Sequence, residues 1–242
     1  MRNIILGMSA LALAAVATPA LAQDEASSSG ISISANAGVY SEYRFRGVGL
    51  SNGDFVIQGG IDASHDSGFY VGTWGSSLGD SDPLAYGGTE IDIYGGWSGE
   101  VTPGLTVDVG VLYYWYPNSA AGDFDYWEPY ASVSGTVGPV DATFGVAYAP
   151  DQDSLGSSDN LYVYTDLSTG VPGTPLSVSG HLGYTDGFLT YTPDGNAWDW
   201  SLGASASLTE NLSLGVSYTG VEGVGLKHVT DDAVVVSLSA SF

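Results

Sequence analysis

Apolar and polar residues alternate along almost the whole chain from residue 32 onward. In residues 104–116 every second position is apolar, and the positions between hold Thr, Asp, Gly, Leu or Tyr. Residues 140–148 repeat the pattern. Side chains of a strand point alternately to its two faces, so alternation over about ten residues predicts a β-strand with one apolar face. No helical periodicity follows the first 22 residues, and we expect an all-β fold.

Twelve segments carry this alternation. They are residues 32–46, 54–64, 68–78, 89–98, 104–116, 126–137, 140–149, 159–167, 176–185, 197–208, 211–219 and 232–242. In the third segment, Phe69 and Val71 compete with Tyr70, Trp74 and Leu78 for the apolar face. The register of residues 68–78 therefore stays open.

The connections between segments alternate in length. Most odd-numbered segments are followed by long connections rich in Asp, Gly, Pro and Ser, such as 79–88 and 117–125, and most even-numbered ones by short connections, such as 65–68 and 209–211. Short turns at one end and long loops at the other are typical of outer-membrane barrels, whose turns are periplasmic and whose loops are extracellular. We therefore predict one closed antiparallel transmembrane β-barrel of about twelve strands.

A soluble β-sandwich also alternates, and two features argue against it. The less apolar face carries many Gly, Ser, Thr and Tyr residues, which suits a lumen better than a solvated surface. Aromatic residues also gather near segment ends, as in the girdles of membrane barrels. They are Tyr43, Phe45, Trp97, Tyr113, Trp115, Trp127, Tyr148, Tyr184, Trp198 and Tyr218.

The two ends of the chain indicate its destination. Residues 1–22 resemble a secretory signal peptide, with Arg2 ahead of an apolar stretch and Ala20-Leu21-Ala22 as the cleavage site. Residues 23–31 would then be a short periplasmic segment, and residues 32–242 the barrel. The last segment ends on the aromatic Phe242, which resembles the signal read by the outer-membrane assembly machinery. We expect this machinery, outer-membrane lipid and lipopolysaccharide as partners, in the outer membrane of a Gram-negative cell.

Composition narrows the chemistry. The chain has 27 acidic and 4 basic residues and a formal net charge of −23, which argues against nucleic acid as a partner. It has no cysteine, so disulfides, thiol nucleophiles and cysteine metal sites are excluded. The acidic stretch 151–160 departs from the calcium-loop pattern at Leu155 and lacks its closing Glu. We expect no cofactor and no metal.

Beyond the expected signal peptide only Arg44, Arg46 and Lys227 are basic. Alternation places Glu42, Arg44 and Arg46 on the lumen face of the first strand. Acids occupy the same face at the outer ends of other strands: Asp54, Glu90, Asp92 and Glu128. The arginines could simply pair with these acids, because buried charges need partners. They could also form a charged constriction that selects solutes. We take Glu42, Arg44, Arg46, Glu90, Asp92 and Glu128 as the candidate constriction.

Several stretches resemble the TorF family of porins. The run YSEYRFRGVGLSNGDFVIQGGIDASHDSGFYVGTW at 40–74 is similar to the family's opening, and TEIDIYGGW at 89–97 is similar to one of its strands. YWEPYASVS at 126–134 and WDWSLGASASLTENLSLGVSYTG at 198–220 also resemble it. The resemblance spans nearly the whole chain after the signal peptide. It implies an outer-membrane pore and supplies no substrate.

We therefore expect a channel for small hydrophilic solutes or ions. Inward tyrosines should keep the bore small, and the acidic wall should favour cations. The alternative is a non-conducting barrel that serves as a structural anchor or binds a partner at the cell surface. An enzyme is disfavoured, because no motif brings a serine beside any of the three histidines. For His181 we expect a lumen residue bonded to neighbouring hydroxyls.

Overall fold

The structure is a computed structural model that describes residues 30–79, 84–119 and 124–242. The expected signal peptide and residues 23–29 of the expected periplasmic segment lie outside the described residues, and Ile31, the last residue of that segment, already belongs to the first strand. The elements in chain order are β1 (Ile31–Tyr40), β2 (Arg44–Phe45), β3 (Val48–Gly49), β4 (Val56–His65), β5 (Phe69–Ser77), β6 (Thr89–Thr102), β7 (Leu105–Trp115), β8 (Tyr126–Val137), β9 (Val140–Gln152), a 3-10 helix (Asp153–Leu155), β10 (Ser158–Gly170), β11 (Leu176–Gly187), β12 (Asn196–Ser207), β13 (Leu212–Val221) and β14 (Ala233–Ser241). The described residues include no helix long and apolar enough to cross a membrane.

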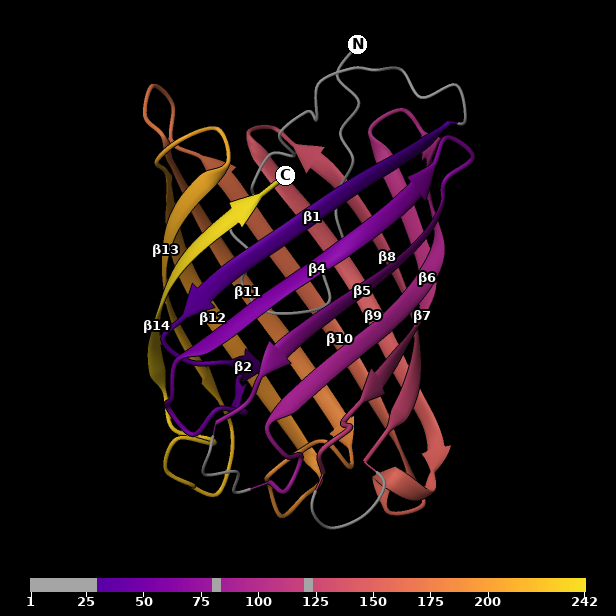
Figure 1. Ribbon diagram of the computed structural model, residues 1–242, viewed down its shortest axis with the longest axis vertical. Coiled ribbons are helices and arrows are strands. Elements are labelled where there is room, and N and C mark those ends of the chain that lie inside the picture. The colour runs from indigo at the N-terminus through magenta and orange to yellow at the C-terminus, as the bar shows by residue number, and fades with distance from the viewer. Residues whose placement is uncertain (1–29, 80–83, 120–123) are drawn as a thin grey trace.

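Twelve of the strands form one closed antiparallel barrel, as predicted. Each strand from β4 to β14 pairs with its neighbours in sequence, and β1 closes the ring by pairing with both β14 and β4. The β1–β4 pairing runs up to Tyr40 opposite Val56. Figure 1 shows the strands tilted against the barrel axis, with β1 starting and β14 ending at the same end. Closure removes unpaired strand edges, so every barrel strand has two partners.

Connections of different length separate to the two ends of the barrel, also as predicted. Short turns such as 66–68, 103–104 and 138–139 lie at the end where β1 starts. Long connections such as 41–55 and 222–232 lie at the opposite end. We call these the inner end and the outer end. This segregation is the pattern of outer-membrane barrels.

Alternation holds along the barrel strands, with large apolar side chains pointing outward. Ile57 and Leu202 are each 69% exposed, and Phe69 and Val71 also face outward. Tyr70 and Trp74 point into the lumen, which settles the register of the third segment. Six of the expected girdle aromatics are exposed near the outer rim: Tyr113, Trp115, Trp127, Tyr148, Trp198 and Tyr218.

The prediction for the first segment is wrong beyond Tyr40. The strand ends there, and residues 41–55 turn into the barrel and form the β2–β3 hairpin (Figure 1). Tyr43 and Phe45, expected in the outer girdle, are buried at 1% and 9% exposure. Asp54, expected on the inner face of a strand, lies exposed in the loop before β4. A hairpin alternates with the same period as a strand, so periodicity cannot separate the two.

Inward tyrosines lie along the barrel wall, over glycines of neighbouring strands. A Cβ atom on Gly72 would meet the ring of Tyr94, and one on Gly110 would meet that of Tyr130. The tyrosine is in each case the direct cross-strand partner of its glycine. Aromatic rings that cover glycine in this way stabilise a sheet through cross-strand contact.

Candidate functional site

Residues 41–55 lie inside the barrel, in the half of the lumen nearer the outer end. We call them the inner hairpin, because they fold into the lumen. The Tyr43 hydroxyl donates to Glu90 on β6 at 2.8 Å. The Tyr43 ring packs against Trp74 on β5 with ring centres 5.7 Å apart. Phe45 meets the edge of Tyr114 on β7, also at 5.7 Å. The inner hairpin and the walls of β5, β6 and β7 therefore share one buried cluster of side chains.

Arg46 reaches across the lumen from the tip of the inner hairpin. Its guanidinium pairs with the Glu128 carboxylate on β8 at 2.6 Å, and the two side chains are 8% and 2% exposed. The same guanidinium lies 4.1 Å from the ring centre of Tyr162 on β10 and 4.7 Å from that of Phe45. Ion pairing and cation–π contact thus hold Arg46 against the far wall.

Arg44 points elsewhere and ties the inner hairpin to the β13–β14 loop. It pairs with Glu42 at 2.7 Å and donates to the carbonyl oxygen of Gly47 at 3.1 Å. It also donates to the carbonyl oxygens of Val229 and Asp231 at 3.3 and 2.8 Å. Arg44 and Glu42 therefore lie in the inner hairpin and its loop contact, instead of on the face of the first strand where alternation placed them.

Glu90 and Asp92 on β6 and Glu128 on β8 face the lumen, as predicted, and we call them the acidic chamber. Their exposures are 0%, 0% and 2%. Tyr114 donates to Glu128 at 3.2 Å. Neither oxygen of Asp92 has a hydrogen-bond partner among the described residues. The structure thus brings Arg46, Glu90, Asp92 and Glu128 together, while Glu42 and Arg44 form a separate pair.

Sequence reasoning missed the surroundings of His181 on β11. Its Nδ1 lies 2.6 Å from Asp166 on β10, and its Nε2 lies 2.9 Å from Asp199 on β12. The hydroxyl of Tyr162, the one hydroxyl partner that the structure shows, lies 2.8 Å from Nε2. Ionised carboxylates only accept hydrogen bonds, so both ring nitrogens must donate, which fits the imidazolium form. Asp166 is the cross-strand partner of His181, a relation visible only once the strand register is known.

We expect His181→Ala to lower the free energy of unfolding by about 2 kcal/mol, because it leaves the buried Asp199 without its cationic partner. The measurement is a urea titration of the refolded barrel in detergent, followed by tryptophan fluorescence. His65→Ala is the matched control, since His65 lies exposed in the turn after β4. Equal stability of the two variants would contradict a structural role for the His181 ion pairs.

The inner half of the lumen is open to water. Ser32, Ser34 and Asn36 point inward from β1 and are exposed. Deeper in, Tyr94 donates to Asp62 at 2.6 Å, and Tyr70 donates to Asp108 at 2.6 Å. The described lumen thus combines a polar inner half, whose side chains on β1 are exposed, with an outer half filled around the inner hairpin.

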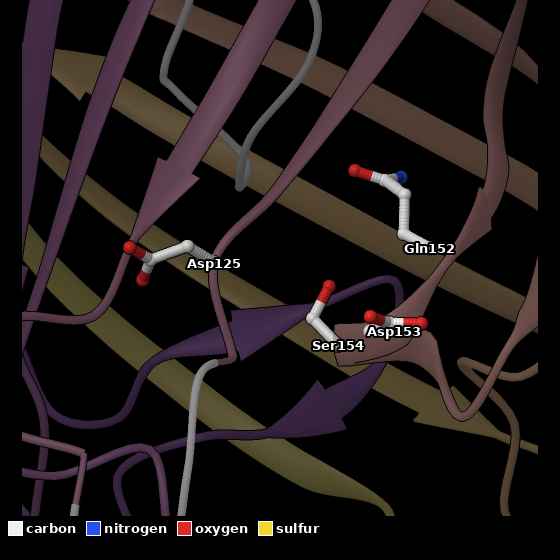
Figure 2. A pocket seen from close by; sticks show the side chains of 4 residues that line it. All are labelled: Asp125, Gln152, Asp153 and Ser154. Carbon is white, nitrogen blue, oxygen red and sulfur yellow. The ribbon is translucent and has the colours of Figure 1, made fainter.

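A separate hollow of about 430 Å³ lies at the outer rim. Figure 2 shows it between Asp125, Gln152, Asp153 and Ser154. The Gln152 amide is already bonded to both backbone groups of Trp127, at 3.0 and 3.1 Å. Two carboxylates, one amide and one hydroxyl fall short of the six to eight oxygens that calcium takes. No group of three or more His, Asp or Glu in the described part of the chain could hold a metal ion.

Comparison with known sequences places the chain. The profile of Gcw_chp, described as a bacterial protein of unknown function, matches residues 24–242. The chain belongs to the Gcw_chp family. A search of curated proteins finds no match to this Gcw_chp chain. The family that matches does not carry the TorF name, so the resemblance to TorF porins is not confirmed.

Solved structures show what the Gcw_chp barrel is similar to. The NanC porin superposes with a TM-score of 0.61 at 9% sequence identity, covering 87% of this chain and 99% of the porin. An outer membrane channel from Pseudomonas putida F1 gives a TM-score of 0.48 at 14% identity, covering 88% of this chain and 94% of the channel. The likeness to the NanC porin shows that the Gcw_chp chain has the fold of a porin.

Proposed function

We propose that this barrel is an outer-membrane channel for the passive diffusion of small hydrophilic solutes or ions, with a preference for cations. The observation that carries the proposal is the lumen itself, which is polar, open to water in its inner half and lined by carboxylates in its outer half. Carboxylates in a low-dielectric passage attract cations and repel anions. The likeness to the NanC porin and the resemblance to TorF porins support the same proposal.

The exterior supports a place in the outer membrane. Side chains such as Ile57, Leu202 and Val236 are exposed all around the barrel, and aromatics gather at its outer rim. An apolar band of this extent would associate with other surfaces in water and is stable in lipid. The expected signal peptide and the terminal Phe242 fit export and assembly there, and lipopolysaccharide is then the outer-leaflet neighbour.

The candidate constriction lies where the inner hairpin meets the acidic chamber. The constriction holds three acidic groups against the one guanidinium of Arg46, and this excess of acids over bases favours cations over anions. Glu42 and Arg44 shape this constriction indirectly, by fixing the inner hairpin to the β13–β14 loop. The arrangement suits a channel better than an enzyme, because the polar partners of His181 in the described structure are two carboxylates and a phenol, with no serine among them. The expectation that no serine lies beside a histidine is wrong for His65, whose Nδ1 lies 2.7 Å from the Ser67 hydroxyl, but this pair is exposed in the turn after β4 at the inner end.

We expect the purified, refolded barrel to give discrete conductance steps in a planar lipid bilayer. In a KCl gradient the reversal potential should have the sign of a cation-selective pore, because acidic groups outnumber basic groups along the lumen. The steps should be small, since the inner hairpin fills much of the outer half. Silence from a barrel whose heat-modifiable mobility shows it to be folded would contradict the channel.

The buried cluster around the inner hairpin favours a second candidate, a non-conducting barrel that anchors surface loops or binds a partner. Tyr43, Phe45 and Arg46 all pack against the barrel wall, as a permanent plug would. The same bilayer experiment separates the two functions. A folded but silent barrel supports the anchor, and discrete steps support the channel.

A further inference from the structure

Arg46 occupies a backbone position that does not suit it. It stands at the tip of the inner hairpin with φ of 49°, followed by Gly47 with φ of 77°. The flanking residues Phe45 and Val48 are paired, so the turn has two residues, both with positive φ. Such turns favour Asn or Asp followed by Gly, and an arginine in the left-handed region costs about 1 kcal/mol. Contacts of the Arg46 side chain must offset this cost.

Those contacts hold the guanidinium group by charge and by aromatic contact, although its Nη1 atom has no hydrogen-bond partner among the described residues. The Glu128 carboxylate supplies the charge at 2.6 Å. The rings of Tyr162 and Phe45 supply aromatic contact at 4.1 and 4.7 Å. A carboxylate flanked by aromatic rings is the arrangement that suits a flat, weakly hydrated organic cation.

The acidic chamber can also accept more hydrogen bonds than Arg46 donates. It holds three buried carboxylates, of which Glu128 is paired with Arg46. Both oxygens of Asp92 and the Oε1 atom of Glu128 have no hydrogen-bond partner among the described residues. Because buried polar groups are normally hydrogen-bonded, acceptor oxygens left without partners in the chamber that holds the Arg46 guanidinium indicate a site for ligands that donate hydrogen bonds.

We propose that Arg46 is the built-in occupant of a binding site for small organic cations of the guanidinium class, and that such solutes replace it when the inner hairpin moves. Glu128 binds the charge of the solute, Tyr162 contacts its flat face, and Asp92 accepts hydrogen bonds that Arg46 leaves unused. The transport of these solutes rests on the proposed channel function, whereas their binding does not.

The test uses Arg46→Asn, which removes the guanidinium and keeps a residue that the turn favours. The probe is guanidinium chloride at millimolar concentration, far below its denaturing range, with KCl at equal ionic strength as reference. We expect the unfolding temperature of the refolded variant in detergent to rise with guanidinium and saturate, because a ligand that binds only the folded state stabilises it. The wild-type barrel, whose site is occupied, should show at most about a tenth of this rise at the same concentrations.

Three controls define the result. Adding Glu128→Gln to Arg46→Asn should abolish the response, and Lys227→Asn, which removes a cation from an exposed loop, should leave the barrel as unresponsive as wild type. Arg46→Gly serves as the second turn-compatible variant. The proposal is overturned if the folded variants do not respond, or if KCl produces the same rise. Saturable guanidinium binding by a barrel that does not conduct would refute the channel function and support the binding site. Conductance without guanidinium binding would support the channel function and refute the binding site.

Discussion

Replacing residues 42–54 with a short Gly-Ser turn is expected to raise the unitary conductance at least about threefold. The replacement removes the inner hairpin, whose side chains fill the outer half of the lumen. It leaves the barrel intact, because β1 and β4 remain paired up to Tyr40 and Val56, and a short turn can join them there. Removal of Arg46 also exposes all three carboxylates of the acidic chamber, so the reversal potential should move further toward that of potassium.

The measurement is single-channel recording in a KCl gradient, beside a matched change at the inner end. Replacing the exposed turn at 171–175 with the same Gly-Ser sequence removes nothing from the lumen and should leave conductance unchanged. If the deletion of residues 42–54 gave a folded barrel with wild-type conductance, the inner hairpin would not be the constriction.

Glu128→Ala should release the inner hairpin and expose Arg46 to trypsin. The substitution leaves a buried guanidinium without its carboxylate, which costs about 3 kcal/mol, and the hairpin can avoid this cost by moving Arg46 into water. We expect cleavage after Arg46 to accelerate at least about tenfold, since about 1.4 kcal/mol already changes an opening equilibrium by that factor. In the wild type, Arg44 and Arg46 are buried and should resist cleavage.

Lys227 makes the experiment self-calibrating. It is already exposed in the β13–β14 loop of the wild type, so cleavage after Lys227 shows in every variant that trypsin is active. Glu210→Ala is the matched substitution, because Glu210 is an exposed carboxylate in the turn between β12 and β13. If Arg46 stayed protected in Glu128→Ala, the ion pair would not be what holds the hairpin in the lumen.

The barrel itself was predictable because its signal is repeated twelve times. Each strand presents an apolar face to the outside of the barrel and a polar face to the lumen. Apolar and polar residues therefore alternate with a period of two, which is easily recognised in the sequence. The alternation failed at residues 41–55, where Tyr43 and Phe45 imitate the outward face of a strand. They are instead buried inside the barrel, because the chain turns into the lumen after Tyr40. Local alternation of apolar and polar residues does not indicate where such a turn occurs.

For the candidate site, the sequence predicted which acidic side chains of β6 and β8 face the lumen, but not which side chains pair with each other. Alternation along β6 and β8 was enough to place Glu90, Asp92 and Glu128 in the lumen. The pairing of Arg46 with Glu128 joins residues 82 positions apart and depends on how the inner hairpin folds. The contacts of His181 with Asp166 and Asp199 depend on the register of three strands. Neither relation is present in one strand's pattern.

The tyrosines that cover glycines change what limits the width of this passage. Because the rings of Tyr94 and Tyr130 lie flat along the wall, over Gly72 and Gly110, much of their bulk occupies space that the glycines leave free. These rings therefore narrow the bore less than the number of inward tyrosines suggests. The width of the passage there depends on residues that have no side chain, because a methyl group on Gly72 or Gly110 would displace the tyrosine ring that covers it.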